Sequence, residues 1–167
     1  MRKLAALILL SLMLFNLAGC GKEQQYKQPI SFYYKTANLS YDAVCSTITP
    51  EIREGADLQS TQDILNLYFA GPNSDSMVSP FPADLTLISC QLDEDTLYLI
   101  VSDELAALSG IDLTLACCCM TLTCLSVTDA DTVCIQAETA LLGGQKSITM
   151  DTDTFLLLDS SDQNTNS

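Results

Sequence analysis

The pattern of hydrophobic and polar residues changes several times along the 167-residue chain, and each change marks the boundary of a predicted segment. An almost unbroken apolar run over residues 4–15 follows a basic start. It is too short to span a bilayer comfortably, so it predicts a signal-peptide core. Residues 20–29 are mostly polar and predict a tether. Patterned segments over residues 30–158 predict one folded domain, whereas residues 159–167 have no apolar residue to bury and predict a disordered tail.

The first part of the domain has the composition of strands. Residues 30–35 alternate, with Ile30, Phe32 and Tyr34 on one face, and predict a strand. Residues 44–48 alternate more weakly and predict a second strand that Pro50 stops. The four residues after Pro50 are predicted to be an exposed extended segment or turn.

A helix is predicted to follow, with a clear start and a clear end. Ser60 is a capping residue, and Asp63 lies at the acidic capping-box position three residues later. Gly71 provides a left-handed stop, and Pro72 prevents the helix from continuing. The apolar residues at helical spacing on one face are Ile64, Leu65, Tyr68 and Phe69.

The second half predicts a hairpin, a helix and a further strand. Residues 85–92 and 96–102 flank the acidic turn 93–95. Residues 97–101 are apolar on both faces, so this strand is predicted to be central, with material packed on each side. A second helix is predicted from Asp112 or Thr114 to about Ser126. Because it is apolar nearly all round, we expect it to be largely buried.

A strand over residues 132–137, a tight turn at Gly143–Gly144 and a short apolar piece at 155–158 complete the predicted domain. The order β-β-α-β-β-α-β predicts an α+β domain. We expect a small mixed β-sheet with two helices packed on one side.

The segment Leu17-Ala18-Gly19-Cys20 resembles the lipobox of bacterial lipoproteins. On this interpretation residues 1–19 are a lipoprotein signal peptide, and the thiol of Cys20 carries a diacylglyceryl group with acyl chains such as palmitate. The alternatives are an ordinary secretory signal and an uncleaved anchor. A lipidated Cys20 predicts a protein held at the outer face of the cell membrane, as in Gram-positive-type lipoproteins.

The charge balance narrows the choice of partners. The chain has 7 basic and 21 acidic residues and a net charge of −14. Arg2 and Lys3 lie in the predicted leader and all the acids lie beyond it, so the mature chain would carry −16. This balance argues against nucleic acid as a partner, because binding it requires basic residues. It also argues against a basic patch on anionic lipid, so the lipid itself is expected to provide the membrane link.

Eight cysteines are present and no histidine. With Cys20 lipidated, seven remain, an odd number that cannot form a complete set of disulfides within one chain. No C-x-x-C pair has metal-knuckle spacing, and Cys117, Cys118 and Cys119 would point in different directions on a helix. We therefore interpret the seven as small buried apolar residues, with disulfides or a metal as the alternative, and we predict no cofactor.

Six segments of the domain have a distinctive order along the chain, and they are residues 30–34, 64–72, 81–82, 85–88, 121–122 and 132–135. In this order they resemble the GerMN domain of sporulation and spore-germination lipoproteins. The resemblance covers residues 30–158. It implies a binding or assembly module of the cell envelope, with no catalytic residues to transfer.

The predicted function is thus that of a non-catalytic, lipid-anchored module that binds an envelope protein or cell-wall partner, or assembles with itself. The candidate partner-binding loop contains Gly71, Pro72, Met77, Val78 and Phe81. The alternative for these residues is a loop folded onto its own core.

A small envelope enzyme, or a ligand-binding lipoprotein acting on cell-wall material, is the alternative function. Without histidine, a nucleophile would need a base such as Lys146 beside Ser147. The acidic pairs Asp93/Asp95 and Asp151/Asp153 could suggest catalytic carboxylates or calcium ligands, but solvated turns explain them better.

Overall fold

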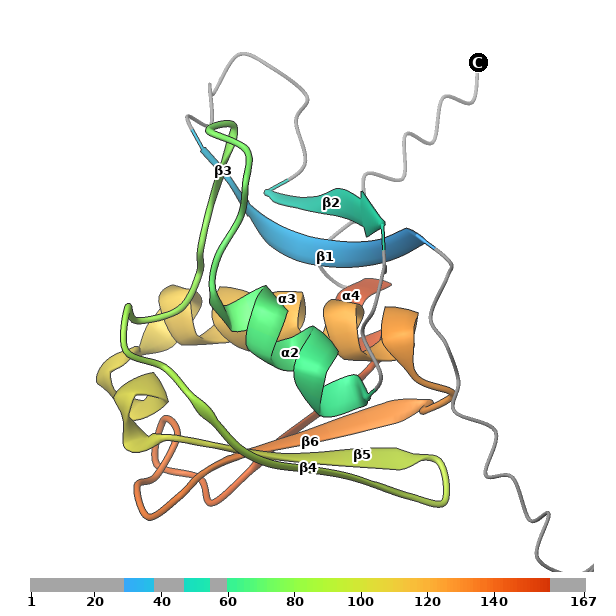
Figure 1. The fold of residues 1–167 in the computed structure, drawn as a ribbon. Helices are drawn as coiled ribbons and strands as arrows, with labels where there is room; N and C mark the ends of the chain where they lie inside the picture. Colours follow the sequence, from blue (N-terminus) through green and yellow to red (C-terminus); the bar gives the residue numbers. More distant parts are fainter. Residues whose placement is uncertain (1–28, 38–46, 55–59, 157–167) are drawn as a thin grey trace, which may run out of the picture.

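The helices of the domain lie between two β-sheets (Figure 1). The computed structural model describes residues 29–37, 47–54 and 60–156. One sheet has the order β2-β1-β3 and the other β4-β5-β6-β7, in which only the β5–β6 pair is parallel. The strands are β1 (Pro29–Thr36), β2 (Ile48–Glu54), β3 (Met77–Val78), β4 (Leu87–Asp93), β5 (Thr96–Val101), β6 (Thr132–Ala137) and β7 (Ile148–Asp151). The helices are α2 (Thr61–Phe69), the 3-10 helix η2 (Asp103–Ala107), α3 (Gly110–Val127) and α4 (Thr152–Leu156).

The predicted α+β class is confirmed. The four-stranded sheet is the expected small mixed sheet, with α2 and α3 on one side of it. The prediction of a single sheet required the first two strands to join it, but they do not. They form a separate antiparallel sheet on the opposite side of the helices. The helices therefore have a sheet on each side, and the core has two interfaces.

Helix α3 is buried because it lies between both sheets. Contacts join it to β1 on one side and to β6 and β7 on the other. Its length and composition would also suit a membrane span, but 56% of it is buried inside the domain. The apolar character all round the helix is explained by its two covered sides.

Side-chain hydroxyls of the helices form hydrogen bonds with the backbone of β1 along the edge that does not pair with β2. The backbone amide of Tyr33 donates to Thr123 Oγ1 at 3.0 Å, and Ser126 Oγ donates to the carbonyl of Ser31 at 2.9 Å. The hydroxyl of Tyr68 donates to the carbonyl of Tyr33 at 2.7 Å. Helical side chains thus replace a neighbouring strand along this edge.

The prediction that Pro50 stops the second strand is wrong. Strand β2 runs through Pro50, which lies opposite Tyr33, and continues to Glu54. Because β2 is an edge strand, the missing amide of a proline removes no bond from the sheet when that position faces outward. The predicted strand residues 44–46 lie outside the described residues.

Strand β5 is central, as predicted, but only one of its faces is covered. Leu97, Leu99 and Val101 are buried toward the helices, whereas Tyr98 is 42% exposed on the other face. The prediction of packing on both sides is therefore wrong for the described part of the chain. The helices all gather on the inner face of this sheet, and its outer face is left to solvent.

The predicted ends of α2 are confirmed. The amide of Asp63 donates to Ser60 Oγ at 3.1 Å, and Ile64, Leu65 and Tyr68 are buried. The hairpin turn after β4, the strand β6 and the turn at Gly143–Gly144 are also present. Pro29, expected to close the tether, begins β1. The predicted leader, Cys20 with most of its tether, and the tail lie outside the described residues.

The turn after α2 depends on a left-handed backbone. Gly71 has a φ of +97°, and the space where a side chain would begin is open. Gly71→Ala is therefore expected to lower the free energy of unfolding by about 1–2 kcal/mol through backbone conformation alone. Urea denaturation would measure the loss. Gly71→Asn should lose less, because asparagine tolerates positive φ better, and equal losses for both variants would contradict this explanation.

Candidate partner-binding surface

Five aromatic rings meet where α2 packs beneath β1. The Tyr68 ring lies at the centre, and its centroid is 5.0–5.6 Å from the centroids of its neighbours. These neighbours are Phe32, Tyr34, Phe69 and Phe81. Offset and edge-to-face pairs of this kind add to the stability that burial of the rings provides. The cluster fixes the end of α2, and with it the start of the candidate loop.

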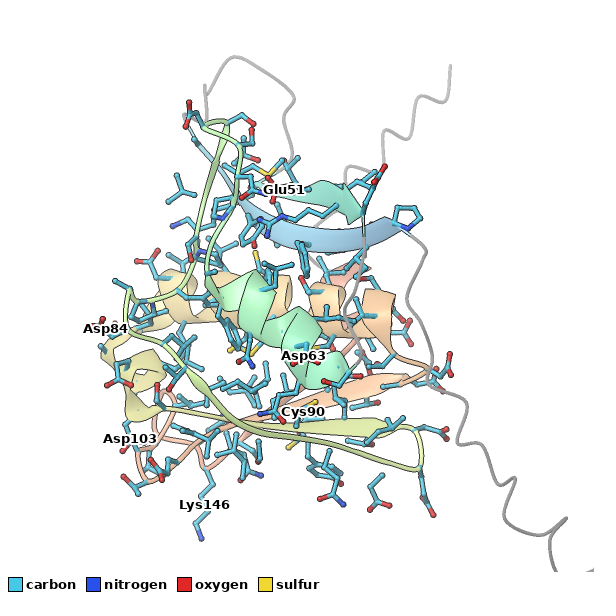
Figure 2. The ribbon with its side chains drawn as sticks, in the orientation of Figure 1. Glu51, Asp63, Asp84, Cys90, Asp103 and Lys146 are labelled. Atoms are coloured by element: carbon cyan, nitrogen blue, oxygen red, sulfur yellow. The ribbon has the colours of Figure 1, made fainter. Side chains whose placement is uncertain are left out.

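An ion pair from β2 holds the turn that follows α2. Arg53 and Glu51 bond to each other, and each side chain is only 11% exposed. Arg53 Nη2 donates to the carbonyl of Gly71 at 2.7 Å, and Glu51 Oε1 accepts from the amide of Asn73 at 2.9 Å. The guanidinium carbon also lies 4.8 Å from the centre of the Phe32 ring. Glu51 can be seen where β2 faces the helices (Figure 2).

This ion pair was not predicted. The segment after Pro50 was expected to be exposed, but Glu51 and Arg53 face the core side of the sheet, beside Ile30 and Phe32. The alternation of residues 48–54 carries a signal for this arrangement, because it places Glu51 and Arg53 on one face and Pro50 and Ile52 on the other.

The phenols of the cluster have no role as acids or bases near neutral pH. Burial raises the pKa of Tyr34 to about 12, although the Arg53 guanidinium acts in the opposite direction. Burial also raises the pKa of Tyr68 well above its ordinary value. The Tyr34 hydroxyl donates to the carbonyl of Tyr68 at 2.9 Å. Both hydroxyls thus serve as fixed hydrogen-bond donors.

The five residues of the candidate loop have different environments. Gly71 and Pro72 form the half-buried turn held by Arg53. Phe81 is buried in the aromatic cluster, which agrees with the alternative of a loop folded onto its own core. Met77 is half-buried and Val78 is 51% exposed, and together they form β3, which pairs with β1. Only Val78 therefore presents a well-exposed apolar side chain.

Val78 belongs to a wider surface that the sequence did not reveal. In the register of the sheet, Val78 and Ile48 lie opposite Lys35, Pro50 lies opposite Tyr33, and Ile52 lies opposite Ser31. Ile52 is 70% exposed. We call the sheet β2-β1-β3, which lies above the helices in Figure 1, the upper sheet, and we call Tyr33, Pro50, Ile52 and Val78 its outer face. Lys35 on this face pairs with Asp112 of α3 at 3.3 Å.

A hollow of about 360 Å³ lies at the opposite end of the helix layer, between β1, β4 and the end of α3. Its lining mixes apolar residues with hydroxyls and one carboxylate, from Pro29, Ile30, Thr61, Cys90, Leu92, Leu97, Ser126, Val127, Thr128 and Asp129. The hollow is large enough for a small ligand.

Acidic residues gather at one end of the four-stranded sheet. They come from the β4–β5 turn, the α3–β6 connection and the start of α4, and are Asp93, Glu94, Asp95, Asp129, Asp131, Asp151 and Asp153. Within the described ranges, no group of three or more metal-ligating side chains is placed to hold an ion. Bonds from the Thr154 hydroxyl and amide lower the pKa of Asp151, as in an ordinary turn. Lys146 extends away from the domain (Figure 2).

Six cysteines fall within the described residues, and none of these is paired with another. Five are buried, as predicted, and Cys90 is partly buried. Burial raises the pKa values of Cys117 and Cys119 to about 12, and it raises the pKa of Cys124 well above its ordinary value. These thiols are therefore protonated and poorly reactive near neutral pH. Cys20 and Cys45 lie outside the described residues.

Comparison with solved structures identifies the fold. The tandem GerMN domains of the sporulation protein GerM from Bacillus subtilis superpose with a TM-score of 0.55 at 17% identity, covering 78% of this chain and 47% of that one. The chain has a GerMN-like fold. A candidate lipoprotein from Clostridium perfringens aligns with a TM-score of 0.47 at 17% identity, over 80% of this chain and 93% of that one. No family model matches the sequence, and no curated protein is similar to it.

The predicted GerMN resemblance is thus confirmed at the level of fold. The segments that carried it lie at the centre of the GerMN-like domain: residues 64–72 form α2 and its stop, and Phe81 joins the aromatic cluster.

Proposed function

We propose that this chain is a lipid-anchored, non-catalytic module outside the cell membrane that binds or assembles with proteins of the cell envelope, in sporulation, germination or envelope maintenance. The GerMN-like fold is the observation that carries the proposal. The lipobox-like segment ending at Cys20 supports the anchor and the location. The protonated, buried thiols and phenols support a non-catalytic domain, since such groups are weak nucleophiles and bases.

The anchor has a direct test. Cells expressing the chain would be fed an alkyne fatty acid, and Cys20→Ala is expected to abolish labelling and release the protein from membranes. Two or more acyl chains give stable anchoring at about 0.8 kcal/mol per buried methylene, so the release should be nearly complete. Cys134→Ala, a cysteine inside the domain, is the matched control and should label normally. Undiminished labelling of Cys20→Ala would refute the lipoprotein assignment.

We propose the outer face of the upper sheet as the surface that binds an envelope partner. A pull-down from detergent-solubilised membranes would use the full chain as bait. Ile52→Ser with Val78→Ser is expected to reduce capture of whatever partner the native chain retains. Leu141→Ser, which alters a comparably exposed leucine on the loop after β6, should leave capture unchanged. Equal capture by all the variants would exclude this face.

The hollow beside β4 favours the alternative of a ligand-binding lipoprotein that acts on cell-wall material. Soluble wall fragments could be titrated into the purified chain and followed by calorimetry. Thr61→Trp would fill part of the hollow. If this variant lost a heat of binding that the native chain shows, the result would favour ligand binding over the assembly role. No heat of binding in the native chain would count against it.

A further inference from the structure

Most sheet edges in the described part of the chain are protected against pairing with another strand. The β2 edge contains Pro50 and three charged residues, and β7 has only four residues and ends in Asp151. The edge of β1 is occupied by the hydroxyls of Thr123 and Ser126, and β3 has only two residues. Proline, charge, short length and covering side chains are the usual protections of an edge strand.

Strand β4 is less protected, because it has seven residues and its one charge, Asp93, lies at its very end. Residues 87–92 contain no charge and no proline, and among the described strands β4 pairs only with β5. A bulge at Ile88 interrupts one end of the pairing, but residues 89–93 are in regular register with β5. Ile88 and Leu92 are 45% and 46% exposed. This edge therefore offers free backbone groups beside apolar side chains, the combination that binds a further strand.

The two exposed side chains are placed symmetrically about one residue. Ile88 lies two positions before Cys90 and Leu92 two positions after it. We propose that β4 pairs antiparallel with β4 of a second copy, with the twofold axis at Cys90. Ile88 then lies opposite Leu92 of the second copy, and the reverse contact is made across the axis. In this single register, each of the two exposed apolar side chains contacts an apolar side chain of the other copy.

The charge distribution favours this antiparallel arrangement. The acidic turn at residues 93–95 follows directly after β4. In the antiparallel pair, Asp93 lies opposite Leu87 of the second copy, so the two Asp93 residues are about 20 Å apart at about 3.3 Å per residue. This separation exceeds the Debye length of about 8 Å at physiological salt, so repulsion between the acidic turns is screened. A parallel pair would place the turns side by side.

The hollow beside β4 supports the same interface. Cys90 and Leu92 form part of its wall, and a second copy along β4 would cover that side. Cys90 lies on β4 beneath α2 (Figure 2). Pro29, the last residue of the predicted tether, lines the same hollow. Both tethers would therefore enter their domains beside the interface, as two anchors in one membrane require. A second copy of this chain is then the partner in the assembly role proposed above.

The association can be measured on the full chain purified in detergent, by light scattering with the detergent mass subtracted. We expect twice the mass of one chain. Ile88→Lys with Leu92→Lys should give the mass of a single chain, because charged side chains block edge pairing. Leu141→Lys, on a distant loop, should retain the dimer. Circular dichroism would establish that each variant is folded. A single-chain mass for the native protein overturns the proposal and leaves the edge to a different partner.

Cysteine cross-linking gives a second test that does not depend on the folding of the lysine variants. Copper(II) phenanthroline would accept the two electrons lost when the Cys90 thiols of two copies join and release two protons. We expect a dimer band on a non-reducing gel that Cys90→Ser removes and Cys134→Ser retains. A band that survives Cys90→Ser overturns the twofold axis proposed here. Cys20→Ala should still cross-link in detergent, so a failed anchor and a failed interface are distinguishable.

Discussion

Replacing Arg53 with Met is expected to lower the free energy of unfolding by about 3–5 kcal/mol. The change removes the partner of a Glu51 side chain that is only 11% exposed, so a carboxylate is left largely desolvated and without its counter-charge. It also removes the donor to the carbonyl of Gly71. The stacking of the guanidinium on Phe32 is lost as well. Urea denaturation at pH 7 would measure the change.

Two further variants separate the ion pair from simple loss of packing. Arg53→Met with Glu51→Met removes both charges, and should recover part of the lost stability, because replacing both partners of a buried pair is often nearly neutral. Glu54→Gln, an exposed glutamate at the end of β2, is the matched control and should change stability by less than about 0.5 kcal/mol. A loss below about 1 kcal/mol for Arg53→Met would contradict the role assigned to the pair.

The domain is expected to unfold in alkali between about pH 9 and pH 12. Burial raises the pKa values of Cys117 and Cys119 from 9.0 to about 12. Above pH 9 these thiols ionise in the unfolded chain but stay protonated in the folded one, so stability present below pH 9 falls as the pH rises toward 12. Each thiol contributes about 1.4 kcal/mol per pH unit, and the two together about 5 kcal/mol at pH 11. That is a large part of a typical domain's stability.

Thermal melts under reducing conditions from pH 7 to pH 11 would show this dependence. The melting temperature should be nearly constant to about pH 8.5 and then fall steeply. Cys117→Ala with Cys119→Ala is expected to flatten the alkaline slope, whatever its effect at pH 7. Cys90→Ala, which removes a less buried thiol, should flatten the slope less. An unchanged slope in the double variant would exclude the thiols as the cause.

Much of the fold could be predicted because its signals are local. Ser60, Asp63 and Gly71 mark the ends of α2 through bonds and backbone angles that involve only near neighbours. The acidic turn after β4 and the apolar length of α3 are similarly local. The order of these pieces was sufficient to indicate a GerMN-like fold at 17% identity.

The rest depends on contacts that local patterns do not encode. Whether Phe81 points to solvent or to Tyr68 is decided by how the loop folds back on α2. Arg53 reaches Gly71, 18 residues further along the chain, only because β2 lies over the end of that helix. The separate upper sheet depends on hydroxyls of α3 that lie 90 and 95 residues beyond their partners on β1.

The candidate surface illustrates the same division. Gly71 and Phe81, which the sequence placed in the candidate loop, hold that loop in position and leave Val78 exposed. Ile52, which is 70% exposed on that face, was missed because Pro50 was interpreted as the end of a strand. An edge strand tolerates proline, and strand order cannot be obtained from one segment alone.

The bonds between β1 and α3 also set an order of events for a chain that emerges from its N-terminus. Ser31 and Tyr33 find their partners at Ser126 and Thr123, which are separated from them by 95 and 90 residues. In the export that we propose, β1 and β2 would remain outside the membrane with one edge unpaired until nearly all of the domain has crossed. Such distant closure slows folding. With the proposed anchor at Cys20, this first hairpin would be the segment that chaperones outside the membrane bind.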